Sequence, residues 1–100
     1  MDINELTHAM HSFVSDKGWY GPDSPRPQTL RNLAISLSLE AGEVLEHFQW
    51  EENNYNPDEL SQELADVALY LLQIASIAGI DLEAAILRKL SDNYLRTWDT

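Results

Sequence analysis

The chain contains one long helix-patterned segment, residues 57–78, which reads PDELSQELADVALYLLQIASIA. Asn56 and Pro57 form an N-cap followed by proline at the first helical position, and Gly79 is a typical helix stop. The apolar part of the segment is interrupted by polar residues and is too short to span a bilayer comfortably. The segment therefore predicts a buried helix of a helical bundle.

Three further helices are predicted around this segment, over residues 2–16, 29–50 and 82 to about 95. Residues 18–28 hold two glycines and three prolines and predict a loop. Without any alternating strand pattern, the fold class is all-α, a bundle of four helices in a single domain, residues 1–100. A chain this small buries a limited core, so we expect a homo-oligomer.

The composition is strongly acidic, with 6 Lys and Arg against 17 Asp and Glu and a formal net charge of -11. Such a charge repels nucleic acid polymers and anionic membranes, and admits a small polyanion only together with a divalent cation. The chain has no cysteine, which is compatible with a reducing compartment. Its N-terminal residues lack the basic and apolar regions of a signal peptide, so we expect a cytoplasmic protein.

Two acidic pairs, Glu40-x-x-Glu43 and Glu63-x-x-Asp66, lie in two of the predicted helices among Leu, Ala, Val and Ile. Residues three apart on a helix share a face, so each helix presents two carboxylates. Hard cations take oxygen ligands, and the sequence predicts a Mg²⁺ site, with Mn²⁺ as a substitute. A carboxylate-bridged di-iron site is disfavoured because neither Glu40 nor Glu63 has a histidine three residues later.

On a helical wheel the acids belong to two polar stripes, which hold Asn32, Ser36, Glu40, Glu43, His47 and Trp50 on one helix and Glu63, Asp66, Tyr70 and Gln73 on the other. These stripes could be the solvated faces of amphipathic helices. Neither stripe holds a Lys or Arg, and each holds a large aromatic residue, which favours a binding site over a solvated face.

The chain resembles the all-α nucleotide pyrophosphohydrolases of the MazG-like superfamily, and most closely the small dCTP pyrophosphatase branch. The resemblance is carried by residues 37–50, LSLEAGEVLEHFQW, and residues 62–71, QELADVALYL, with the E-x-x-E then E-x-x-D pattern. It extends from Phe13 and Trp19 to Lys89 and Asn93. The family's C-terminal Arg-Tyr-Pro run is replaced here by Arg96-Thr97-Trp98.

The resemblance implies Mg²⁺-dependent hydrolysis of a deoxynucleoside triphosphate to the monophosphate and pyrophosphate, as nucleotide-pool house-cleaning by a homodimer or homotetramer. It implies catalytic magnesium ligands at Glu40, Glu43, Glu63 and Asp66, and substrate contacts at Trp19, Trp50, Tyr70, Lys89 and Asn93. Two alternatives stay open, a non-catalytic module that senses nucleotides and a purely structural helical oligomer.

Overall fold

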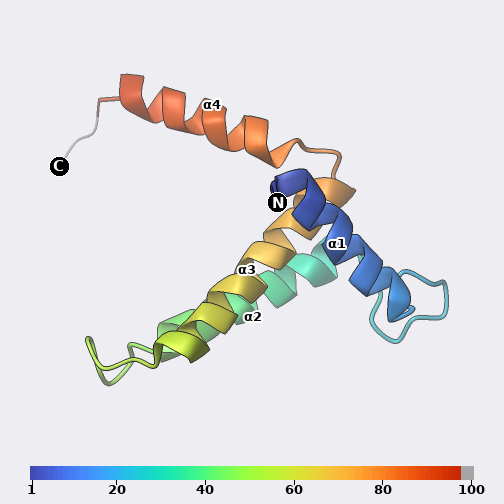
Figure 1. Cartoon of the computed structure of the whole chain (residues 1–100), viewed down its shortest axis with the longest axis horizontal. Coiled ribbons are helices and arrows are strands. Elements are labelled where there is room, and N and C mark those ends of the chain that lie inside the picture. Colours follow the sequence, from blue (N-terminus) through green and yellow to red (C-terminus); the bar gives the residue numbers. More distant parts are fainter. Residues whose placement is uncertain (98–100) are drawn as a thin grey trace.

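The computed structural model describes residues 1–97, which form four α-helices and no strand (Figure 1). The helices are α1 (Ile3–Asp16), α2 (Leu30–Glu46), α3 (Pro57–Ile77) and α4 (Leu82–Leu95). The predicted all-α class with four helices is therefore confirmed. Trp98, in the segment that departs from the family pattern, lies outside the described residues.

Each helix begins where a side-chain oxygen accepts a hydrogen bond from the backbone of the first turn. The capping residues are Asp2, Thr29, Asn56 and Asp81. These side chains satisfy N–H groups that have no partner inside the helix. At the other end of α3, Gly79 has φ +72°, a left-handed conformation that glycine adopts without steric cost. The predicted boundaries of α1, α3 and α4 agree with the structure to within about one residue.

The predicted end of the second helix at Trp50 is wrong, because α2 ends at Glu46. The backbone N–H groups of His47, Phe48 and Gln49 bond to carbonyl groups three residues back, at 3.3, 3.0 and 3.4 Å. This tighter winding is the 3₁₀ pattern common at helix ends, and it turns the chain away from the axis of α2. His47 is the C-cap of α2, and Trp50 lies beyond the helix that was expected to carry it.

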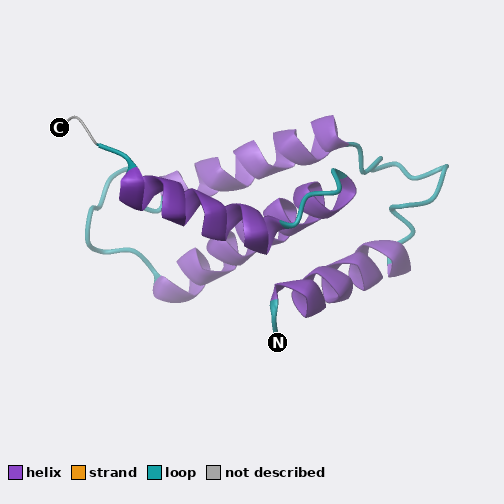
Figure 2. Ribbon diagram, turned by 90° about the horizontal axis from the view of Figure 1, so that it is seen from above, coloured by secondary structure: helices purple, strands orange, loops and turns teal. Residues whose placement is uncertain are grey.

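The helices α2 and α3 lie side by side, and α1 packs against α3 (Figure 1). The main core cluster joins α1 to α3 through Met10, Val14 and Leu72, with Trp19 partly buried against it. The loop of residues 17–29 and the loop of residues 47–56 lie at opposite ends of the molecule (Figure 2). A different loop therefore lies at each end of the α2–α3 pair.

The helix α4 extends away from the α2–α3 pair (Figure 1). Its axis makes an angle of 104° with α3, and none of its residues is buried. Leu82, at its start, packs against the core cluster. Within the described residues no single helix has the length and apolarity needed to cross a membrane, and only α3 and α4 taken together as a bent pair meet those criteria.

Candidate metal centre and adjoining cavity

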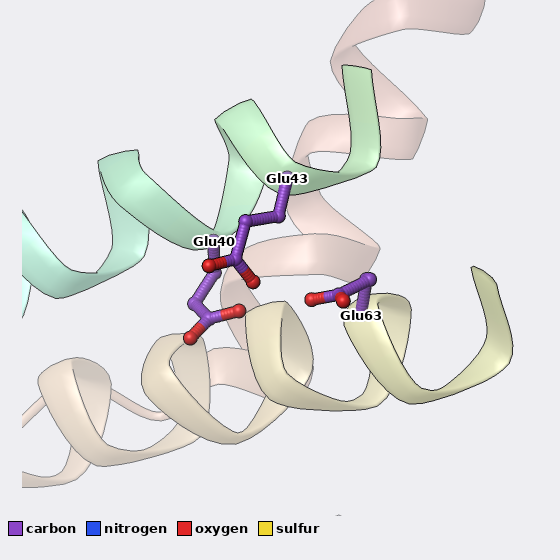
Figure 3. A group of neighbouring side chains, drawn as sticks. All are labelled: Glu40, Glu43 and Glu63. Carbon is purple, nitrogen blue, oxygen red and sulfur yellow. The ribbon is translucent and has the colours of Figure 1, made fainter. Parts of the chain in front are cut away.

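Three of the four carboxylates singled out in the sequence converge between α2 and α3. Glu40 and Glu43 project from α2 and Glu63 from α3, so that one helix supplies two groups and its neighbour the third (Figure 3). One carboxylate oxygen of each residue lies within 4.8 Å of those of the other two. Two helices with matching stripes therefore produce a compact anionic cluster.

Asp66 lies one helical turn after Glu63 and is exposed. The group of three within 4.8 Å does not include it, but its charge raises the pKa values of both Glu40 and Glu63. Asp66 also lines a cavity beside the cluster. Its assignment as a fourth metal ligand stays a prediction.

Two acids of the cluster, Glu40 and Glu63, have raised pKa values. Desolvation raises the pKa of Glu40 to about 7, helped by a hydrogen bond with Glu43 and by the charges of Glu43, Asp66 and Glu63. A hydrogen bond with Glu43 is the main cause that raises the pKa of Glu63. Charges of one sign held this close favour either protonation or a bound cation.

The donor set fits a hard divalent cation. Glu40 Oε2 is a buried oxygen with no hydrogen-bond partner among the described residues. Buried oxygens of native proteins normally have a partner, so an orphan within an anionic cluster is explained by a cation that completes it. Glu40, Glu43 and Glu63 would hold Mg²⁺ or Mn²⁺ and leave coordination positions for water and an anionic ligand.

The metal-free protein is expected to lose stability as the pH rises. Between the ordinary pKa of Glu40, 4.5, and its folded value of about 7, the folded state binds more protons than the unfolded state. The free energy of unfolding then falls with increasing pH across this interval. In EDTA, the melting temperature should be lower at pH 8 than at pH 5.5, and Glu40→Gln should weaken that decline. If the melting temperature fell equally with pH in the wild type and in Glu40→Gln, the raised pKa of Glu40 would not be the cause.

A cavity of about 430 Å³ adjoins the cluster between α1, α2, α3 and the loop of residues 17–29. This volume is within the range of small-molecule sites. Phe13, Val14, Trp19 and Leu33 contribute apolar walls. Its polar lining comprises Arg26, Gln28, Asn32, Ser36, Asp66, Tyr70 and Gln73. The cavity is thus aromatic and partly polar, and Asp66 lies where it meets the acidic cluster.

Trp19 forms an aromatic wall of this cavity. Its ring meets Phe13 edge to face, with ring centroids 5.7 Å apart and planes at 89°. The guanidinium carbon of Arg26 lies 5.4 Å from the centroid of the Trp19 ring. An indole held this way offers a flat surface on which a planar group can stack.

A row of hydrogen bonds links α1, α3 and the loop of residues 17–29, and it reaches the cavity at Gln73 and Gln28. His11 bonds to Tyr20 Oη through Nδ1 and to Ser76 Oγ through Nε2, at 2.5 and 2.7 Å. Gln73 Nε2 donates to Tyr20 Oη at 3.2 Å and to Gln28 Oε1 at 2.8 Å. Gln73 is only 3% exposed, so this row fixes a buried amide at the cavity wall.

The structure brings together some of the predicted substrate contacts and separates others. Trp19 and Tyr70 line the cavity beside Asp66. Trp50 is 85% exposed in the loop after α2 and does not line it. Lys89 and Asn93 lie on α4, which contributes no lining residue. The roles of all five residues as substrate contacts stay predictions.

Comparisons with known proteins agree with the motifs. The MazG-like family model matches residues 35–97. The dCTP pyrophosphatase 1 of Homo sapiens is 35% identical over 104 residues, which cover 95% of this chain and 56% of the relative. The Bos taurus protein of the same name is 34% identical, with 95% and 57% covered. A dATP/dGTP diphosphohydrolase of Salmonella phage PMBT28 is 50% identical over 36 residues, 36% of this chain and 12% of the relative. The chain spans somewhat over half the length of the dCTP pyrophosphatases that it matches.

Proposed function

We propose, from the premise that this chain belongs to the MazG-like family, that it hydrolyses deoxynucleoside triphosphates to the monophosphate and pyrophosphate with Mg²⁺. One observation carries the proposal: the cluster of Glu40, Glu43 and Glu63 lies beside a cavity walled by Trp19. The relatives named dCTP pyrophosphatase support a deoxynucleotide as the substrate. The role would be cleansing of the cytoplasmic nucleotide pool.

The mechanism assigns each part of the site a task. A divalent cation on the cluster would neutralise phosphate charge and lower the pKa of a bound water. The oxygen of the attacking water bonds to the α-phosphorus, the bond from that phosphorus to the bridging oxygen breaks, and pyrophosphate leaves. Glu43, the one cluster residue that is exposed, is open to solvent and accepts the water proton. Trp19 holds the base by stacking.

The proposal includes a homodimer or homotetramer. A stripe of α4 holds Ile86, Leu87, Leu90 and Tyr94, and Leu87 and Leu90 are 60% and 51% exposed. A contiguous exposed apolar stripe is typical of a surface that another chain covers. Lys89 and Asn93 flank this stripe on the same helix. A second copy packed on α4 would bring these two residues towards a cavity other than their own.

The test of the reaction is chromatography of products from canonical and modified nucleoside triphosphates incubated with the protein and Mg²⁺. Monophosphate and pyrophosphate from the wild type, absent with EDTA, are the expected result. Tight nucleotide binding without turnover would instead favour the sensing module. No binding and no thermal stabilisation by Mg²⁺ with nucleotide would favour the structural oligomer.

Trp19→Ala is expected to raise KM about tenfold with a smaller change in kcat, because a base stacked on an aromatic ring gains about 1–3 kcal/mol. Steady-state kinetics on the preferred nucleotide measure this effect. Tyr55→Ala is the matched control, since Tyr55 packs on Phe48 in the loop of residues 47–56 and does not line the cavity. An unchanged KM in Trp19→Ala would show that Trp19 does not bind the base.

A further inference from the structure

The orientation of one amide at the cavity is fixed by a backbone carbonyl. Gln28 Nε2 donates to the carbonyl oxygen of Arg26 at 2.6 Å. A carbonyl oxygen only accepts, so the nitrogen of the Gln28 amide must face it. The oxygen of the same amide, Oε1, therefore faces Gln73, where it accepts the hydrogen bond from Gln73 Nε2.

The orientation of the Gln28 amide in turn fixes the orientation of the buried Gln73 amide. Its Nε2 donates to Gln28 Oε1 and to Tyr20 Oη, which uses both N–H bonds of the amide. The side-chain hydrogen bonds that Gln73 forms within the described residues are these two, so its Oε1 is left as an acceptor. Rotation of the amide by 180° would place two oxygens against each other at Gln28, which disfavours the alternative.

Gln73 lies in the wall of the proposed nucleotide cavity. It lines the same cavity as Trp19 and Asp66, and it is 3% exposed. Asp66 and Gln73 are seven residues apart on α3, which is about 10 Å along the helix axis. A nucleotide with its phosphates near Asp66 and its base against Trp19 would direct the edge of the base towards Gln73.

We propose that Gln73 selects the base, through acceptance by Oε1 of a hydrogen bond from an exocyclic amino group. The inference rests on the proposed nucleotide site. Cytosine carries such an amino group at position 4 and adenine at position 6, whereas uracil, thymine and guanine carry a keto oxygen there. A keto oxygen would face Oε1 with no proton between them, and a buried acceptor without a donor is costly. The site thus prefers amino bases to keto bases.

The test measures affinity, so that it does not depend on turnover. Dissociation constants are measured by calorimetry for dCMP, dUMP and the deoxynucleotide of 2-pyrimidinone, which lacks the 4-amino group. We expect the wild type to bind dCMP about tenfold more tightly than either of the others. Gln73→Met, which keeps the side-chain length without the amide, should bind the three ligands within about twofold of one another. Ser76→Ala, at the far end of the hydrogen-bond row and outside the cavity lining, should keep the wild-type ratios.

Two results would overturn the inference: equal wild-type affinities for dCMP and the 2-pyrimidinone nucleotide, or a preference for dCMP that survives in Gln73→Met. The wild-type comparison stands by itself if Gln73→Met does not fold. Hydrolysis of dCTP is scored separately. Selective binding that is lost in Gln73→Met, without hydrolysis, would support base selection and reject the proposed reaction. No binding of any nucleotide would reject both.

Discussion

Glu63→Gln is expected to lower kcat for nucleoside triphosphate hydrolysis by about 10³-fold and to leave the protein folded. The substitution keeps the shape of the side chain and removes one negative charge from the cluster with Glu40 and Glu43. A bound metal contributes several kcal/mol to the transition state, and each 1.36 kcal/mol is a factor of ten in rate. Without metal the variant should melt at a higher temperature than the wild type at pH 8, because like-charge repulsion is reduced.

The matched control for this prediction is Glu59→Gln. Glu59 is an exposed glutamate in the first turn of the same helix, outside the group of three acids. Its substitution removes the same charge from the protein, so kcat should stay within about twofold of the wild type. Near wild-type turnover in Glu63→Gln would show that Glu63 is not a metal ligand. An equal loss of kcat in Glu59→Gln would point to a nonspecific effect of charge.

A double substitution, Leu87→Glu with Leu90→Glu, is expected to give a folded monomer with at least about tenfold lower activity. Both side chains are exposed on one face of α4, and two carboxylates there would have to be desolvated in any interface that covers this face. If Lys89 and Asn93 serve the site of a neighbouring copy, dissociation removes them from it. Light scattering after size-exclusion chromatography gives the mass, circular dichroism the helicity, and product release the activity.

The control for the interface changes the net charge by the same two units on the other side of α4. Arg88 is exposed and lies away from the stripe of Leu87 and Leu90 on the helical wheel. Arg88→Glu should keep the wild-type mass and activity. A wild-type protein that is already monomeric and active, or an active monomeric Leu variant, would contradict an oligomeric site built with α4.

Local chemistry made much of the fold predictable. Asp2, Asn56 and Asp81 act as N-caps, and Gly79 ends α3, because each of these features depends on residues within one helical turn. The end of α2 was mispredicted because the stripe continues in the sequence to Trp50 while the backbone tightens after Glu46. Periodicity reports side-chain pattern and does not report such a change of backbone winding.

The same distinction applies to the site. Helical spacing was enough to align Glu40 and Glu43 with Glu63, because two facing stripes on packed helices meet. It placed Gln73 on a stripe but assigned it no role. Its partners Tyr20 and Gln28 are 53 and 45 residues away in the sequence and belong to a proline-rich loop with no periodicity. Contacts of that kind depend on tertiary packing, which a single sequence does not report.

The phosphorus atom that water attacks is the most direct test of the proposed reaction. Hydrolysis of dCTP with Mg²⁺ in water enriched in ¹⁸O, followed by mass spectrometry of the products, locates the new oxygen. We expect the label in the nucleoside monophosphate and none in pyrophosphate, since water attacks the α-phosphorus. Label in pyrophosphate, or release of the diphosphate with inorganic phosphate, would contradict the proposed mechanism.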